Sequence, residues 1–202
     1  MAKAGQSLAA GGLEGIAAAL PRDGGKALPP VERWNPPFCG DIEMKIATDG
    51  TWFYQKTPIG RPALVKLFST VLKREGDKYF LVTPVEKVGI VVEDAPFLAV
   101  ELKVTAPEQG VVLQVLRFRT NVDEWIDAGP GHALRFETEA TGGLKPYLHV
   151  RRELWAKVTR ALFYDLVALG EERVVDGKPM FGVVSGGEFF AMAEANALRE
   201  FA

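Results

Sequence analysis

The fold is decided by residues 39–104, CGDIEMKIATDGTWFYQKTPIGRPALVKLFSTVLKREGDKYFLVTPVEKVGIVVEDAPFLAVELKV. Residues 42–46 alternate apolar and charged side chains, which is the period-two pattern of a strand with one buried face. Asp49-Gly50 is a turn signal, and the aromatic residues 52–54 follow it directly. The stretch therefore begins with a predicted β-hairpin.

An amphipathic helix is expected after this hairpin. Pro62 suits the first turn of a helix, because its missing N–H would have no partner there. Apolar residues between 64 and 72 recur at helical spacing, with basic residues on the opposite face. Gly76 then predicts the end of the helix. Further strands are predicted at 79–83, 85–92 and 97–104.

A similar order of elements recurs downstream. Residues 134–138 and 146–150 predict a second hairpin, and 151–169 carry apolar residues at helical spacing. Shifting the first predicted helix by 95 residues places it on the second. We therefore expect an internal duplication, in an α+β protein of two structurally similar tandem units. Each unit would contain a β-hairpin, an amphipathic helix packed on an antiparallel sheet, and further strands.

The two units are predicted to span residues 38–106 and 107–202. The preceding residues 1–37 would form a short helix, with apolar residues at helical spacing over 13–20, and a Pro-rich arm.

The C-terminal region allows two interpretations. Residues 180–184 and 189–190 predict strands that flank a turn at 185–187. Alternatively, Ser185 and Glu188 form a capping box that begins a helix. The tail after this region is either helical or frayed.

Composition excludes several classes of function. The net charge of −2, from 24 basic and 26 acidic residues, gives no electrostatic reason to expect a nucleic-acid or membrane partner. One cysteine and two histidines cannot supply a zinc cluster of the usual ligands within one chain, so no metal is expected. The sequence contains no phosphate-binding P-loop and no dinucleotide fingerprint, so no cofactor is expected. A lone cysteine fits a reducing compartment, and we expect the protein in the cytoplasm.

Arginine side chains are the first candidates for ligand binding. Arg117 and Arg119 point to one face of a predicted strand, and paired guanidinium groups suit a carboxylate or phosphate ligand. Alternatively, they form cross-strand ion pairs with Glu101 or Glu137 on a solvated sheet face. Arg61, near the start of the first helix, would add to an anion site.

Catalytic interpretations rest on few residues. Cys39 with His149 or His132 would form a thiol–imidazole dyad. Glu86 and Glu93 would divide acid and base roles if burial separated their pKa values. Alternatively, Cys39 is a small buried hydrophobic residue at a strand entrance, and Glu93 belongs to a hairpin corner.

Residues 39–100, together with LRFRTNVDEW (116–125), PYLHVR (146–151) and GVVSGG (182–187), resemble the bacterial family catalogued as domain of unknown function 1285. The resemblance covers about residues 30–190. It implies two similar α+β units in tandem and an association with bacterial signal transduction, and it names no catalytic residue.

We therefore expect a non-enzymatic ligand-binding or regulatory protein, with a small anionic ligand or a protein as its partner. One alternative is a hydrolase or transferase that uses Cys39 or paired carboxylates. Another is a structural or interaction module in which the exposed part of 52–54 packs on a partner, so self-association stays open. The ligand site is expected in the cleft between the units, lined by Arg61, Glu86, Arg117, Arg119 and His149.

Overall fold

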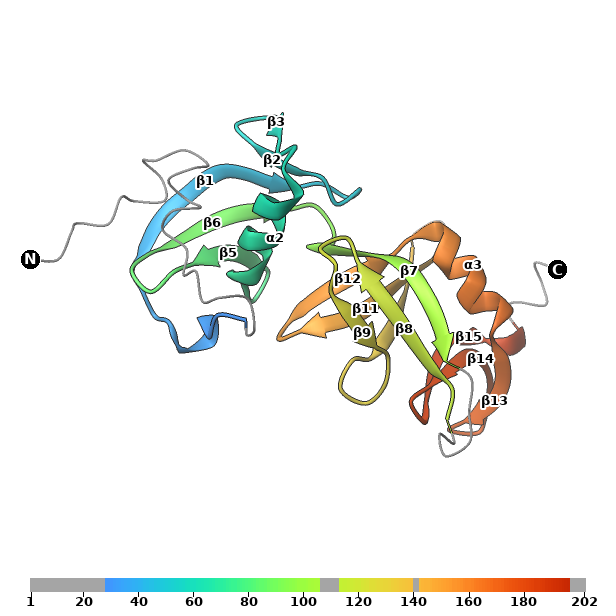
Figure 1. Ribbon diagram of the computed structural model, residues 1–202. Coiled ribbons are helices and arrows are strands. Elements are labelled where there is room, and N and C mark those ends of the chain that lie inside the picture. The colour runs from blue at the N-terminus through green and yellow to red at the C-terminus, as the bar shows by residue number, and fades with distance from the viewer. Residues whose placement is uncertain (1–27, 106–112, 140–141, 197–202) are drawn as a thin grey trace, which may run out of the picture. The chain divides into compact units, whose positions relative to one another are not determined.

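The computed structural model describes residues 28–105, 113–139 and 142–196. The chain divides into two compact units between Pro96 and Phe97, each with its own sheet and helix (Figure 1). Strand β7 (Phe97–Thr105) thus begins the second unit, whereas the predicted boundary falls after residue 106. The helix predicted over 13–20 lies outside the described residues. Within the described ranges, no helix has the length and apolarity that crossing a membrane requires.

The first unit, in its described residues, contains a six-stranded sheet with the order β3-β2-β1-β6-β5-β4. Strands β1 and β6 are parallel, and the other neighbours are antiparallel. The predicted hairpin is confirmed as β1 and β2. The elements are η1 (Val31–Arg33), β1 (Phe38–Ile46), β2 (Trp52–Tyr54), β3 (Thr57–Pro58), α2 (Pro62–Thr70), β4 (Leu72–Glu75), β5 (Lys78–Val82) and β6 (Lys87–Val92).

The core of the first unit lies between the sheet and α2. Met44 and Ile46 of β1 and Ile90 of β6 are buried, as the alternation along these strands predicts. Phe68 of α2 is 0% exposed, and its ring stacks on Trp52 with 6.3 Å between centroids. The apolar stripe of α2 is therefore held against one face of the sheet.

The second unit repeats this sheet topology. Its described residues form a six-stranded sheet with the order β10-β11-β12-β7-β8-β9, in which β12 and β7 are parallel, and a three-stranded sheet β13-β14-β15. The elements after β7 are β8 (Val115–Thr120), β9 (Trp125–Asp127), β10 (Leu134–Thr138), β11 (Leu144–Arg151), β12 (Leu154–Val158), α3 (Arg160–Ala168), β13 (Glu171–Val175), β14 (Lys178–Ser185) and β15 (Glu188–Glu194).

Two similar tandem units are thus confirmed, but the predicted alignment between them is wrong. In each six-stranded sheet, the first strand pairs in parallel with the sixth, so β1 corresponds to β7 and β6 to β12. Helix α2 lies between the third and fourth strands, whereas α3 follows the sixth strand. The shift of 95 residues therefore superposes two helices that occupy different places in the topology.

The first predicted helix is shorter than expected. Helix α2 ends at Thr70, and the chain continues directly as β4. Gly76, with a φ of +60°, lies in the turn between β4 and β5 and does not end a helix. A left-handed φ at this tight hairpin turn is what favours glycine there.

The second predicted helix also begins later than expected. Leu154, Ala156 and Val158 are buried at alternate positions of β12, and α3 begins only at Arg160. Their spacing of two residues is that of a strand, which the wider helical spacing of Trp155 and Val158 conceals.

The strand interpretation of the C-terminal region is confirmed, and no helix begins at Ser185 within the described residues. Strands β14 and β15 pair as a hairpin around the predicted turn. The Ser185 hydroxyl is 0% exposed, donates to the carbonyl of Ala128 at 2.7 Å and accepts from the N–H of Leu116 at 2.8 Å. Ser185 therefore joins this hairpin to β8. The tail after residue 196 lies outside the described residues.

Candidate functional site

The five predicted ligand-binding residues are divided between the units. Arg61 and Glu86 belong to the first unit, and Arg117, Arg119 and His149 to the second. None of the five is among the residues that line the hollows on the sheet of the first unit or beside α3 of the second. None of these three hollows is therefore built from the predicted set.

Arg117 and Arg119 lie in cross-strand ion pairs. Arg117 donates to the Asp127 carboxylate from Nε at 2.5 Å and from Nη2 at 2.8 Å. Arg119 donates to Glu101 at 2.6 Å and to Asp123 at 3.1 Å. These hydrogen bonds raise the pKa of both arginines and lower the pKa of Glu101 and Asp127. Their geometry is therefore that of the alternative interpretation, in which both arginines form ion pairs on a solvated sheet face.

His149 is held by backbone carbonyl groups. Its Nδ1 lies 3.1 Å from the carbonyl oxygen of Gly131, and its Nε2 contacts the carbonyl oxygen of Arg152. The ring also packs edge-on against Trp155, with 5.1 Å between centroids, and stacks on His132 at 5.8 Å. Because both ring nitrogens have carbonyl partners, these contacts fix the imidazole beside the turn that follows β11.

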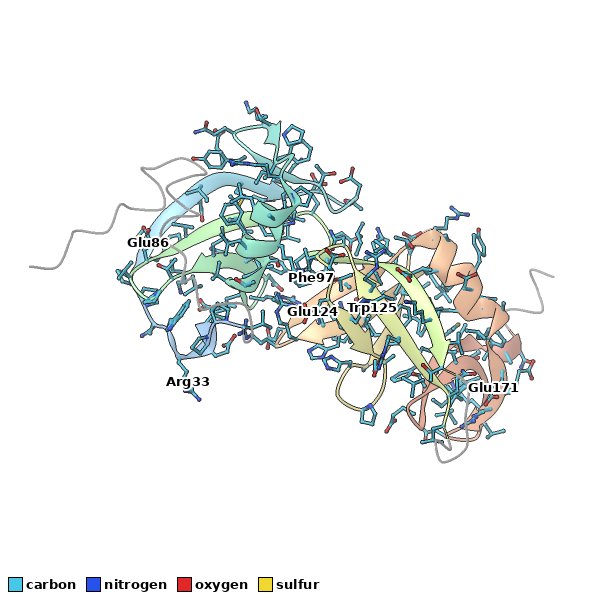
Figure 2. The ribbon with its side chains drawn as sticks, in the orientation of Figure 1. Arg33, Glu86, Phe97, Glu124, Trp125 and Glu171 are labelled. Carbon is cyan, nitrogen blue, oxygen red and sulfur yellow. The ribbon has the colours of Figure 1, made fainter. Side chains whose placement is uncertain are left out.

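Arg61 and Glu86 lie at the ends of elements in the first unit. Arg61 is the exposed residue immediately before α2. Glu86, labelled in Figure 2, lies between β5 and β6 and is 5% exposed. Its backbone N–H donates to the Thr83 hydroxyl at 3.1 Å, and its carbonyl accepts from the N–H of Thr83 at 2.9 Å. Glu86 thus belongs to the hydrogen-bonded turn between β5 and β6.

The structure also shows where the residues of the catalytic interpretation lie. Cys39 is exposed, so its interpretation as a buried hydrophobic residue is wrong. The first residues of β1 face solvent, and the Cys39 thiol donates to the carbonyl of Pro37 at 3.5 Å. Glu93 accepts from Lys45 Nζ at 2.6 Å and from the N–H of Thr48 at 3.0 Å, and these bonds lower its pKa. Among the described residues, no group of three histidine, cysteine or acidic side chains is arranged to hold a metal ion.

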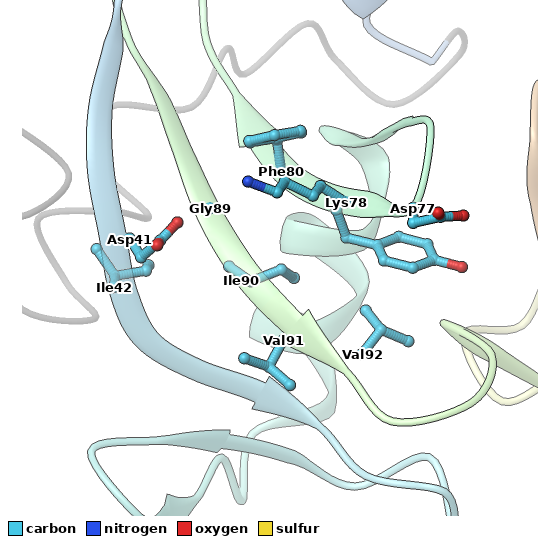
Figure 3. A pocket seen from close by; sticks show the side chains of 10 residues that line it. Asp41, Ile42, Asp77, Lys78, Phe80, Gly89, Ile90, Val91 and Val92 are labelled. Carbon is cyan, nitrogen blue, oxygen red and sulfur yellow. The ribbon is translucent and has the colours of Figure 1, made fainter.

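Two adjoining hollows open on the sheet of the first unit, and Figure 3 shows the smaller one. They measure about 320 and 560 Å³ and share Asp41, Ile42 and Val91. Strand β1 is irregular beside Asp41, whose carboxylate lies over Gly89; a Cβ at that glycine would be 1.9 Å from Asp41 Oδ1. The larger hollow is lined by two lysines and two acidic residues, so its charge favours no class of ligand.

The hollow of the second unit differs because basic side chains dominate it. It measures about 530 Å³ and lies beside β10, β11, β12 and the first turns of α3. Lys145, Lys157 and Arg160 line it, with Glu139 as the one carboxylate among its described lining residues. The remaining lining consists of Gly143, Leu144, Pro146, Val158, Phe163 and Tyr164.

Strand pairing explains why these cations converge. Tyr147 of β11 lies opposite Lys157 of β12, and Lys145 lies two residues from Tyr147 along β11. Side chains two residues apart point to the same face of a strand, so both lysines project from one face of the sheet. Arg160 joins them because α3 begins two residues after β12 ends.

Contacts within the hollow hold the cations in place. Lys145 Nζ lies 3.3 Å from Glu139 Oε1, and Arg160 Nε donates to the Tyr164 hydroxyl at 3.1 Å. The contact with Tyr164 raises the pKa of Arg160, and the Glu139 carboxylate adds to this shift. Arg160 is also the first residue of α3, where the helix dipole has its positive end. The arrangement is suited to binding an anion.

Sequence reasoning missed this hollow. Residues 151–169 were expected to form one helix, which would place Lys157 and Arg160 on a helical surface. The available signal was the alternation of Leu154, Ala156 and Val158, which places Lys157 on the solvated face of a strand.

The fold and this hollow define a protein of two tandem units, with a duplicated sheet topology and a basic cavity in the second unit. The chain belongs to the DUF1285 family. The model "Domain of unknown function (DUF1285), N-terminal domain" matches residues 29–95, and "Protein of unknown function (DUF1285), C-terminal domain" matches 96–192. These matches meet within one residue of the division between the units.

Two solved structures are similar to this chain. A DUF1285 family protein from Silicibacter pomeroyi DSS-3 is 50% identical, with a TM-score of 0.82, over 93% of this chain and 98% of that one. A DUF1285 family protein from Shewanella baltica OS155 is 31% identical, with a TM-score of 0.49, over 63% of this chain and 91% of that one. No curated protein matches the chain.

Proposed function

We propose that the protein is a non-enzymatic ligand-binding protein whose second unit binds a small anionic ligand in the basic hollow. The observation that carries the proposal is the convergence of Lys145, Lys157 and Arg160 on one cavity of about 530 Å³. Cavities of about 300–1,000 Å³ are typical of small-molecule sites. Ammonium and guanidinium groups form charge-assisted hydrogen bonds with carboxylate and phosphate oxygens. An anion in this hollow would therefore meet several donors at once.

The hollow also offers an apolar wall. Phe163 and Tyr164, which follow Arg160 on α3, line it, and their rings lie 6.3 Å apart. Apolar surface next to a few placed charges is the usual composition of a ligand site. The ligand would thus be an organic anion, with its charged group at the cations and its remainder against this wall. A regulatory role in the cytoplasm, including signal transduction, would follow if this ligand were the signal.

Replacement of Arg160 by glutamine should weaken anion binding about tenfold, because one charge-assisted hydrogen bond is lost. The double variant Lys157→Gln, Arg160→Gln should show no measurable binding. The measurement is isothermal titration calorimetry at low salt, with inorganic phosphate and glycerol 3-phosphate as probes.

Lys103→Gln provides a matched control. It removes the same charge from an exposed lysine of the second unit that does not line the hollow, and it should leave affinity unchanged. Two results would contradict the proposal: the unaltered protein binds neither probe, or the double variant binds them as tightly as the unaltered protein does.

A further inference from the structure

We infer that Glu139 is a resident anion of the basic hollow, which means that its carboxylate occupies the anion site when no ligand is bound. Glu139 thereby excludes singly charged ligands, and the site binds dianions such as phosphate monoesters. The inference rests on the proposed function, because it concerns the anion that would enter this hollow. It adds a class of ligand and a residue that sets specificity.

The geometry places the Glu139 carboxylate where a ligand anion would bind. Its Oε1 lies 3.3 Å from Lys145 Nζ, and the Glu139 and Lys145 side chains are 38% and 37% exposed. Its Oε2 lies 2.9 Å from the position that a Cβ on Gly143 would take, so the carboxylate folds back over the hairpin. The electrostatic influence of Glu139 also reaches Arg160, whose pKa it helps to raise. Glu139 therefore interacts with two of the three cations.

The backbone holds Glu139 at this position. Its N–H donates to the carbonyl of Gly143 at 2.7 Å, and its own carbonyl accepts from the N–H of Gly142 at 2.9 Å. The Cα of Glu139 is thus fixed at the end of the hairpin, while the partly exposed side chain keeps rotamer freedom. An entering anion would displace the carboxylate by rotation of the side chain, without a change in the sheet.

Charge then decides which anions gain from binding. Lys145, Lys157 and Arg160 line the hollow with one carboxylate, and that carboxylate is paired with Lys145. A monoanion that takes the place of Glu139 at Lys145 replaces one single charge by another and gains little. A phosphate monoester carries about 1.5 to 2 negative charges at neutral pH, so it replaces the single charge of Glu139 by a larger one and gains from binding. Its organic part would lie against Phe163 and Tyr164.

Glu139→Gln tests this inference, because glutamine keeps the shape of the side chain and removes its charge. The unaltered protein should bind glycerol 3-phosphate and should show no measurable binding of acetate. In the variant, acetate binding should become measurable, and affinity for glycerol 3-phosphate should rise about two- to fivefold, since a competing ion pair is removed. Glu194→Gln is the matched control: Glu194 ends β15, pairs with Lys178 and does not line the hollow. It should leave both affinities unchanged, and thermal unfolding should confirm that both variants are folded.

The outcomes separate this inference from the proposed function. If acetate and glycerol 3-phosphate bind the unaltered protein equally well, or if Glu139→Gln raises neither affinity, Glu139 is not a resident anion, although the hollow still binds anions. If neither the unaltered protein nor the variant binds either probe, the proposed function fails and the inference fails with it.

Discussion

Replacing Phe68 by alanine should lower the free energy of unfolding of the first unit by about 3–5 kcal/mol. The Phe68 side chain is fully buried on α2, and its ring stacks on Trp52 with 6.3 Å between centroids. Alanine would leave a cavity between the helix and the sheet, whose hydrogen-bonded strands cannot close around it. Urea unfolding followed by tryptophan fluorescence would measure the loss, because Trp52 lies beside the substituted ring.

Lys66→Ala is the control for this substitution. Lys66 is exposed on the same helix, so its replacement should change stability by no more than about 0.5 kcal/mol. A loss below about 1 kcal/mol for Phe68→Ala would show that α2 does not carry the core of the first unit.

Replacing Gly182 by alanine should destabilise the second unit by about 3 kcal/mol, at the upper end of the cost of overpacking. A Cβ at this position would lie 2.3 Å from the carbonyl oxygen of Phe190 and 2.9 Å from the Cα of Ala191. Both contacts involve the backbone of β15, where the pairing with β14 is irregular. The neighbouring strand would therefore have to move. Thermal unfolding should show a decrease of about 10 °C or more.

Gly129→Ala is the matched control in the same unit. The nearest atom to a Cβ there is the Cα of Gly186 at 3.8 Å, an ordinary contact, so its unfolding temperature should stay within about 3 °C of the unaltered protein. Equal stability of the two glycine variants would contradict the close approach of β14 and β15.

Local patterns were sufficient to predict the first hairpin but not the ends of the helices. Alternation over 42–46 and the Asp49-Gly50 turn are signals within a few residues, and both are found in the structure. Leu72, by contrast, continues the apolar spacing of α2 and equally fits the alternation of β4. Its pairing with Leu81 of β5 places it in the strand, and such pairing has no local signature.

The duplication was predictable from local patterns, but the correct alignment of the two units was not. Similar hairpins and helices recur along the chain, and this is visible in the sequence. The equivalence of β1 with β7, however, rests on the parallel pairs β1–β6 and β7–β12. These pairs join segments that are distant in sequence and leave no local pattern. The sequence comparison therefore aligned the two amphipathic helices, whose apolar spacing is similar, instead of the equivalent strands.

The candidate site shows the same limit. The alternation of Arg117 and Arg119 places them on one strand face, but their partners Asp127 and Glu101 come from neighbouring strands and are set by register. Lys145 and Lys157 share a face only because β11 pairs with β12 in the observed register. A shift of one residue would turn one of them to the opposite face.

The anion site of the second unit is tested most directly by a ¹H–¹⁵N NMR titration of the full chain with glycerol 3-phosphate. Shifts should be largest for the amides of Lys145, Lys157 and Arg160 to Phe163, and they should disappear in the Lys157→Gln, Arg160→Gln variant. An absence of shifts, or shifts confined to residues of the first unit, would contradict the proposed site.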